Sequence, residues 1–308
     1  MKIVFPDRID LDDKAVDRFK QLDVEMYDDT PGNEDVIIER IKDAEIITAN
    51  FINITKRIID SSPKLKYIIA SATGYEWIDY EYAKTKGIKV LNCPTQNVEA
   101  VAEHAVALML AVAHRIVEAN SDLANGNWSQ QDLPGIEITN KKLGLVGYGR
   151  VGKLIEKKVS GFSMKISHVN SKSSPEELDE LLRSSDIVCL CLPLNKETKD
   201  LIDKRRVNLL TEDVILVNVA RGALVDQDAL YEALQNRNIR GAGLDVYRNE
   251  PFTGKPIDSI VEIAKLPNVV ATPHMAFNTH ETTERLGAEL YENVQSCINS
   301  NPNNVVNN

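Results

Sequence analysis

One segment near the middle of the chain restricts the possible folds most: Gly147-Tyr148-Gly149-Arg150-Val151-Gly152. An apolar run at 143–146 precedes it and a helical pattern at 151–159 follows, so the glycines occupy a turn from a strand into a helix. The first glycine permits a tight turn, the second lets a pyrophosphate approach the backbone, and the third lets helix and strand pack closely. The amino end of the helix then holds the anion. The segment therefore predicts a dinucleotide-binding unit that begins inside the chain.

The pattern around this segment predicts an α/β fold with two units. Short β-branched runs alternate with helical stretches on both sides of the glycines. The predicted strands lie at 3–5, 24–27, 45–49, 67–71 and 88–91 before them, and at 165–169, 186–192, 213–219, 241–246 and 268–272 after them. Apolar residues at helical spacing predict one long helix between the units, from the cap Asn97 to about Glu118, and a final helix at about 280–299.

The composition is that of a globular chain, with 308 residues of which 43% are hydrophobic and 27% are charged. No apolar run approaches the roughly 18 residues that cross a bilayer, and the start of the chain lacks the pattern of a secretory signal. We therefore expect a cytoplasmic protein. The formal net charge of -10 disfavours nucleic acid and anionic membranes as partners, so an anionic substrate would need a local cationic clamp.

The four cysteines are predicted to be core residues. Cys189 and Cys191 would share one face of a strand, whereas Cys93 and Cys297 lie far from them and lack the spacing of metal ligands. The pattern predicts neither a disulfide framework nor a metal site.

Five short motifs follow one another along the chain. Besides the glycine segment, they are Val-Glu-Ala-Val-Ala-Glu-His-Ala at 98–105, Asn-Val-Ala-Arg-Gly at 218–222, Leu-Asp-Val-Tyr with Glu-Pro at 244–251, and Thr-Pro-His at 272–274. In this order they resemble the D-isomer-specific 2-hydroxyacid dehydrogenase family, and the resemblance covers essentially the whole chain. It implies two Rossmann-like or flavodoxin-like domains, with a dinucleotide-binding domain at 99–280 inserted into a substrate domain formed by 1–98 and 281–308. It also implies an active site in the cleft between these domains.

The resemblance implies reduction of a small 2-oxoacid, of the hydroxypyruvate or glyoxylate type, with NAD(P)H. Such a reaction needs an anion clamp, a proton donor for the carbonyl oxygen and a hydride source. Arg221 and His274 follow predicted strands, and strand carboxyl ends are where ligands bind in open α/β sheets. The forked guanidinium of Arg221 suits a carboxylate, and histidine is a natural proton donor near neutral pH. From the resemblance, Glu250 is the carboxylate that pairs with His274 and favours its charged form.

The other four histidines are interpreted as structural. His104 and His114 fall in the predicted long helix, His168 in a strand and His280 near the start of the last helix.

The resemblance places the substrate carboxylate on backbone amides of the loop Ala72-Thr73-Gly74, with Arg221 and Phe277 as further substrate contacts. This loop and the aromatic residue at 277 resemble the glycerate dehydrogenase (hydroxypyruvate reductase) branch of the family. However, 277–279 also resembles D-lactate dehydrogenases, and Gln96 stands where the glycerate branch often has tyrosine. A pyruvate reductase of the D-lactate dehydrogenase type stays an alternative, as does a dinucleotide-sensing binding protein similar to the transcriptional corepressors of this fold.

The preferred cofactor depends on the residue after the second Rossmann strand. NAD enzymes usually place an acid there for the ribose hydroxyls, whereas this chain has Asn170, followed by Ser171 and Lys172. Hydroxyls and an ammonium can receive a 2′-phosphate, so we expect NADP(H), with NAD(H) as the alternative. The segment is also typical of a polar loop that ends at the helix start Pro175. Further cofactor-binding residues are predicted at Leu192, Pro193, Thr198, Val219, Ala220, Asp245 and His274.

The resemblance also suggests a homodimer formed through the Rossmann domains. The long helix after Asn97 and the loop near Trp128 are the expected contacts.

Overall fold

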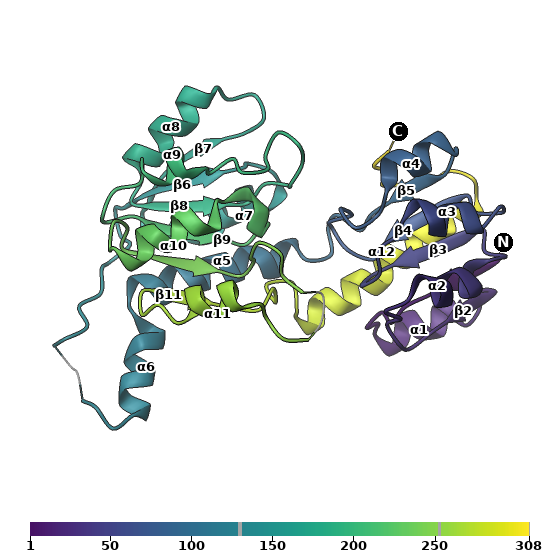
Figure 1. Cartoon of the computed structure of the whole chain (residues 1–308), viewed down its shortest axis with the longest axis horizontal. Coiled ribbons are helices and arrows are strands. Elements are labelled where there is room, and N and C mark those ends of the chain that lie inside the picture. Colours follow the sequence, from purple (N-terminus) through teal and green to yellow (C-terminus); the bar gives the residue numbers. More distant parts are fainter. Residues whose placement is uncertain (129–130, 252–253, 308) are drawn as a thin grey trace. The chain divides into compact units, whose positions relative to one another are not determined.

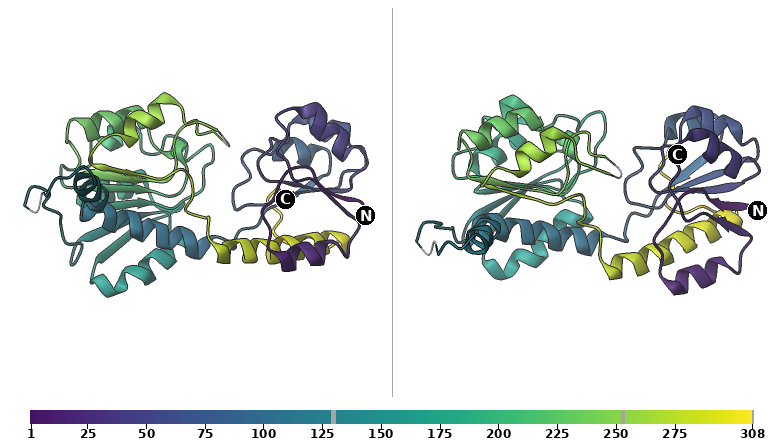
Figure 2. Two further views of the ribbon diagram at one scale, coloured as in Figure 1. Left: turned by 90° about the horizontal axis from the view of Figure 1, so that it is seen from below. Right: turned by 60° about the horizontal axis from the view of Figure 1, so that its bottom comes forward.

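The structure is a computed structural model that describes residues 1–128, 131–251 and 254–307. The chain forms two compact units, one made of Met1–Asn97 with Asn278–Asn308 and the other of Val98–Phe277. Each unit contains one wholly parallel sheet with helices on both faces (Figures 1 and 2). The predicted α/β fold class is therefore confirmed.

The first unit has a five-stranded sheet in the order β2-β1-β3-β4-β5. Its strands are β1 (Ile3–Phe5), β2 (Val24–Met26), β3 (Ile46–Ala49), β4 (Tyr67–Ala70) and β5 (Lys89–Leu91), and its helices are α1 (Asp13–Phe19), α2 (Glu34–Ile41), α3 (Lys56–Ser61), α4 (Tyr80–Thr85) and α12 (His280–Ile298). Side chains alternate across the sheet, as strand geometry requires. Ile3 and Phe5 pack with α1 and α12, whereas Val4 packs with α2 and α3.

The last helix returns to the first sheet. A Cβ added at Gly287 of α12 would lie 2.5 Å from the Cβ of Ala15 in α1, so these two helices approach closely. Beyond α12, the side-chain oxygen of Asn307 accepts a hydrogen bond from the backbone N–H of Val90 in β5. The two ends of the chain therefore belong to the first unit, and residues 98–277, which lie between them in the sequence, form the second.

The second unit has a six-stranded sheet in the order β11-β10-β9-β8-β6-β7. The strands are β6 (Lys142–Val146), β7 (Lys165–Val169), β8 (Ile187–Leu190), β9 (Ile215–Asn218), β10 (Gly241–Leu244) and β11 (Val269–Ala271). Helices α5 (Val98–Ala113) and α7 (Arg150–Val159) cover one face, and α8 (Pro175–Ser184), α9 (Lys204–Val207), α10 (Gln227–Gln235) and α11 (Asp258–Ala264) cover the other. The strand order reverses between β6 and β8, and in such sheets ligands bind outside the carboxyl ends of the strands at this switch point.

The predicted single helix from Asn97 to about Glu118 is wrong. The structure has two helices, α5 and α6 (Ile116–Ala124), bent by 61° relative to each other. Arg115, between them, has φ 53 in the left-handed region, which no α-helix continues through. Among the described residues no single helix is long and apolar enough to cross a membrane, and this bent pair passes that test only when its members are taken together.

The predicted core positions agree with the structure for three of the four cysteines. Cys93, Cys189 and Cys297 are buried, and the partly buried thiol of Cys191 donates to the carbonyl of Gly147. No group of three or more His, Cys, Asp or Glu side chains is arranged to hold a metal ion in the described part of the chain.

Candidate active site

The glycine segment forms the turn from β6 into α7, at the switch point of the second sheet. Gly147 has φ 98, and a Cβ there would lie 2.6 Å from the carbonyl oxygen of Cys191. A Cβ at Gly152 would lie 2.6 Å from the carbonyl oxygen of Gly147. Both positions therefore require glycine, the first for its backbone conformation and the second for close packing of the helix on the turn.

Gly149 differs from these two glycines because a Cβ there would meet no described heavy atom within 4 Å. The space outside its backbone is open. Gly149 also precedes Arg150 and Val151, the first residues of α7, and no side chain caps this end of the helix. The turn thus leaves both room and amide donors for a pyrophosphate group, so the residues fit a dinucleotide.

The segment after β7 is a hydrogen-bonded turn. The side-chain oxygen of Asn170 accepts from the N–H of Lys172 at 2.9 Å, and Asn170, Ser171 and Lys172 are all exposed. Ser174 then caps α8 in a capping box with Glu177. The turn at Asn170 and the cap at Ser174 account for the backbone conformation of this loop. Binding of a 2′-phosphate by its side chains stays a prediction.

The loops after β8 and β9 contain the other predicted cofactor residues. The hydroxyl of Thr198 donates to the carbonyl of Pro193 at 2.8 Å and closes the loop that begins at Leu192. After β9, Val219 is buried and the N–H of Ala220 donates to the side chain of Asn218 at 3.0 Å. Their contacts with a cofactor stay predictions.

His274 and Glu250 lie in direct contact at the carboxyl end of β11. Nδ1 of His274 is 2.5 Å from Oε1 of Glu250, and Oε2 of Glu250 accepts from the N–H of Tyr247 at 2.9 Å. The side chain of His274 is 40% exposed, so part of the imidazole is accessible from outside. The ring of Phe277 lies edge-on to it, with 6.1 Å between centroids. The structure therefore brings together three of the predicted site residues.

Arg221 follows β9. The next residue, Gly222, packs against the loop that carries Glu250, the partner of His274. A Cβ at Gly222 would lie 1.9 Å from the carbonyl carbon of Tyr247, so the loop after β9 touches the backbone of the loop that carries Glu250. The guanidinium of Arg221 donates to the carbonyl of Ala220 at 2.7 Å. Only glycine fits at position 222. The motif at 218–222 includes this glycine, but the sequence does not show that it contacts Tyr247.

Asp245, predicted to bind the cofactor, is 1% exposed and holds the loop around His274. Its carboxylate accepts from the hydroxyl of Thr272 at 2.6 Å and from the N–H groups of Met275 and Ala276, both at 2.9 Å. Its backbone oxygen accepts from the N–H of His274 at 2.7 Å. A structural role of this side chain was missed by sequence reasoning, and a contact with the cofactor stays a prediction.

The hydroxyl of Tyr247 adds hydrogen bonds between the loops after β10 and β11. It lies 2.9 Å from the carbonyl oxygen of Leu244 and 3.2 Å from that of Thr272. Burial raises the pKa of the Tyr247 phenol, and the nearby Asp245 adds to this effect, so the hydroxyl stays a donor at neutral pH. The loops after β10 and β11 are therefore joined through buried hydrogen bonds.

The loop Ala72-Thr73-Gly74 lies in the first unit, after β4. The carbonyl of Ala72 accepts from the N–H of Cys93, and the hydroxyl of Thr73 lies 3.2 Å from the carbonyl oxygen of Cys93 and 3.0 Å from the side-chain oxygen of Asn97. These bonds fix the loop against the segment after β5. Its predicted role in substrate binding stays a prediction.

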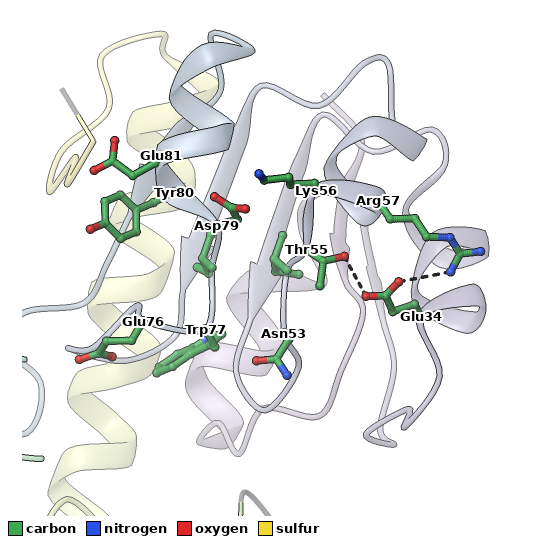
Figure 3. A pocket seen from close by; sticks show the side chains of 12 residues that line it. Glu34, Asn53, Thr55, Lys56, Arg57, Glu76, Trp77, Asp79, Tyr80 and Glu81 are labelled. Atoms are coloured by element: carbon green, nitrogen blue, oxygen red, sulfur yellow. Dashed lines mark hydrogen bonds and ion pairs between the residues drawn. The ribbon is translucent and has the colours of Figure 1, made fainter. Parts of the chain in front are cut away.

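Figure 3 shows a cavity of about 730 Å³ in the first unit, between the segments that follow β3 and β4. Arg57 is paired with Glu34 at its rim, and Thr55 donates to the same carboxylate. None of the residues predicted for substrate or cofactor lines this cavity.

A glycine turn at the switch point of a parallel sheet, with a histidine–carboxylate pair in the loops after two other strands of the same sheet, is the arrangement of a dinucleotide-dependent oxidoreductase. A family model described as "D-isomer specific 2-hydroxyacid dehydrogenase, NAD binding domain" matches residues 106–276. The chain therefore belongs to the D-isomer specific 2-hydroxyacid dehydrogenase family, whose members are oxidoreductases that act on 2-hydroxyacids with a nicotinamide dinucleotide.

Relatives and solved structures agree with this family. A glyoxylate reductase from Thermococcus litoralis is 34% identical over 313 residues, which cover 96% of this chain and 92% of that protein. A glycerate dehydrogenase from Methylorubrum extorquens is 34% identical over 314 residues, which cover 99% and 98%. The structure of an acyclic imino acid reductase (Bsp5) in complex with NADPH and D-Arg superposes with a TM-score of 0.90 at 33% identity, covering 99% of this chain and all of that one.

Proposed function

We propose that the protein reduces a small 2-oxoacid of the hydroxypyruvate or glyoxylate type to a 2-hydroxyacid, with His274 as the proton donor. The contact of 2.5 Å between Nδ1 of His274 and Oε1 of Glu250 carries this proposal. Because Nδ1 faces the carboxylate, Nε2 is the nitrogen that meets the substrate. Similarity to a glyoxylate reductase and a glycerate dehydrogenase supports the substrate class.

Residues of this chain donate the proton, bind the substrate carboxylate and hold the cofactor in this proposal. A nicotinamide dinucleotide, when bound, would supply the hydride for the carbonyl carbon. His274 donates the Nε2 proton to the carbonyl oxygen, and the Glu250 carboxylate balances the charge of the imidazolium. Arg221 binds the substrate carboxylate through its guanidinium fork. The backbone at Gly149 and the first turn of α7 hold the pyrophosphate.

The two units take different roles in this proposal. Residues 1–98 and 281–308 form the substrate domain, in which Ala72, Thr73 and Gly74 offer backbone amides to the carboxylate. Residues 99–280 form the dinucleotide-binding domain.

A substrate panel tests the proposal. Glyoxylate, hydroxypyruvate and pyruvate are offered with NADH and with NADPH to the wild type, His274→Ala and Arg221→Lys. We expect turnover of the first two acids, a loss of roughly a hundredfold or more in His274→Ala, and a raised KM in Arg221→Lys because the fork is lost. A preference for pyruvate would favour a D-lactate dehydrogenase type, and binding of dinucleotide without turnover of any acid would favour a sensing protein.

Reduction of an imino acid is a second candidate. The observation that favours it is the TM-score of 0.90 with an acyclic imino acid reductase in complex with NADPH and D-Arg. Adding methylamine to the pyruvate reaction forms the imine in solution. Faster NADPH oxidation with the amine than without it would support this candidate.

We also propose a preference for NADP(H) over NAD(H). The exposed Lys172 and the serine hydroxyls beside it suit a 2′-phosphate, and Asn170 brings no repelling charge. In Asn170→Asp, kcat/KM should shift towards NADH because only the phosphorylated cofactor meets the new charge. Lys172→Ala should weaken NADPH alone, most clearly at low salt. A wild type that strongly prefers NADH, with Lys172→Ala unchanged, would contradict this preference.

A homodimer completes the proposal, together with the cytoplasmic location expected from the sequence. The described residues of α6 are all at least partly exposed, including Ile116 at 54%, Val117 at 50% and Leu123 at 59%. Trp128, after this helix, is 81% exposed. Apolar groups gathered on one projecting segment are typical of an interface.

A further inference from the structure

A partly buried chain of hydrogen bonds runs from α5 to the loop that carries His274. Nε2 of His104 lies 2.9 Å from Oγ1 of Thr272, and Oγ1 of Thr272 lies 2.6 Å from Oδ1 of Asp245. Nε2 of His104 is also 3.5 Å from the same carboxylate oxygen. The side chains of His104 and Asp245 are 20% and 1% exposed. Residue 104 is remote in sequence from both partners, so only the fold brings them together.

The direction of the hydrogen bonds follows from proton counting. An ionised carboxylate only accepts, so the single hydroxyl proton of Thr272 goes to Asp245. The oxygen of Thr272 then has only acceptor capacity left for His104. Nε2 of His104 must therefore carry a hydrogen and donate it to Thr272.

The chain of hydrogen bonds ends at the backbone of the two residues that follow His274. The Asp245 carboxylate also accepts from the N–H groups of Met275 and Ala276. His274 itself has φ 50, a left-handed conformation that is costly for a residue with a side chain and that needs support from its surroundings. The bonds of Asp245 supply that support on both sides of the histidine.

We propose that His104 is a positioning residue for His274, acting through Thr272 and Asp245. This inference rests on the proposed role of His274 as proton donor. His104 donates to Thr272, which fixes the hydroxyl and with it the carboxylate that holds 275–276. Losing the donor lets the loop around His274 shift, and a shift of about 1 Å in a reacting group can cost up to roughly a hundredfold in rate.

Single-turnover hydride transfer at saturating glyoxylate and NADPH tests the proposal in the full-length protein. The variants are His104→Leu, which removes the donor, His104→Gln, which keeps a side-chain N–H, and Thr272→Val. His114→Leu is the matched control, because His114 is exposed just after α5. Dinucleotide affinity and the thermal midpoint are measured for each.

We expect His104→Leu to slow the step by roughly tenfold to a hundredfold at saturating dinucleotide. His104→Gln should recover most of the rate. Combining His104→Leu with Thr272→Val should slow the reaction no further than the worse single substitution, since both break one chain. In the wild type, nitrogen NMR should show His104 in the Nε2–H form, with its signal identified by its loss in His104→Gln.

Four outcomes overturn the inference. A wild-type rate in His104→Leu, while His274→Ala has lost activity, overturns it and leaves the proposed function intact. A wild-type rate in His274→Ala overturns both. If His104→Leu does not fold, Thr272→Val replaces it, because it breaks the same hydrogen-bond chain at its middle member. A wild-type rate in Thr272→Val, or a hydrogen on Nδ1 alone in His104, then contradicts the proposed chain.

Discussion

At the scale of single residues, Glu250 shows how a loop carboxylate acquires a defined position. One of its oxygens contacts Nδ1 of His274 and the other accepts from the N–H of Tyr247. The backbone contact orients the carboxylate, so the imidazole meets a fixed charge. The effect of this charge on His274 can be separated from the effect of the hydrogen bond by an isosteric substitution.

Glu250→Gln should lower the rate of 2-oxoacid reduction by roughly tenfold, less than loss of the imidazole itself. The amide keeps a hydrogen-bonding oxygen and loses the negative charge, so the charged imidazole becomes less favourable. The values of kcat/KM for wild type and variant, measured in the same buffer, check this. An unchanged rate in Glu250→Gln would count against the pair.

Asp7 is a second carboxyl group with an unusual environment. It is fully buried after β1, and its oxygens accept from the N–H of Phe51 at 2.6 Å and of Asn50 at 3.3 Å. Burial raises the pKa of the Asp7 carboxyl to about 6, against the lowering effect of these hydrogen bonds. Asp7 therefore ties β1 to the loop after β3, at the reversal of strand order in the first sheet.

Asp7→Asn should change how stability depends on pH. The folded state keeps the proton of Asp7 up to about pH 6, whereas the unfolded chain releases it near 3.8. The stabilisation by this group is therefore present below about pH 4 and is lost as pH rises to 6, by about 3 kcal/mol. Urea unfolding of both proteins from pH 4 to 7 should show the wild type losing stability relative to Asp7→Asn. A constant difference would contradict the raised pKa.

At the scale of elements, three glycines show that one residue type serves different purposes at strand ends. Gly147 and Gly222 are placed where a Cβ would collide with another loop, Cys191 in one case and Tyr247 in the other. Gly149 meets nothing within 4 Å in the described structure. Gly147 and Gly222 are thus required by packing, whereas the open space at Gly149 can admit a ligand.

Alanine substitutions should separate these purposes. Gly222→Ala should lower the thermal midpoint and cost at least about 1–3 kcal/mol of stability, since the Tyr247 backbone must move. Gly149→Ala should keep wild-type stability and lose dinucleotide affinity by at least about tenfold, because its methyl occupies the space for the pyrophosphate. Gly161→Ala is the control, as its Cβ would also meet no described atom within 4 Å. Unchanged dinucleotide affinity in Gly149→Ala would remove this turn from the site.

At the scale of the whole molecule, helix α6 exposes apolar side chains that packing within a single chain does not cover. Its apolar residues Ile116, Val117 and Leu123 are exposed. Apolar surface of this kind is stabilised when a second copy covers it.

Leu123→Glu should dissociate the proposed homodimer. Burying an uncompensated carboxylate in the interface should raise the dissociation constant at least about a hundredfold, or ~3 kcal/mol. Sedimentation velocity over a range of concentrations measures this. Val36→Glu, at a position 40% exposed in the first unit, is the control and should keep the wild-type state. A monomeric wild type, or a dimeric Leu123→Glu, would rule out this interface.

The sequence by itself determined the elements whose signal is local. The glycine segment, the alternation of apolar runs with helical stretches and the strand-end motifs predicted an α/β chain with a dinucleotide turn, because turn geometry and strand periodicity depend on neighbouring residues. The family followed from the order of the motifs. Glu250 was assigned only through that resemblance, since a single glutamate in a loop has no periodic pattern.

Only the tertiary structure decided what depends on residues distant in the chain. The break of the long helix at Arg115 is a single backbone conformation that apolar spacing does not encode. The collision that forces glycine at 222, the burial of Asp7 and the contact of His104 with Thr272 all join segments separated by many residues. Their energies depend on packing and on the loss of water around polar groups, and both are set when each sheet assembles with its own helices and loops.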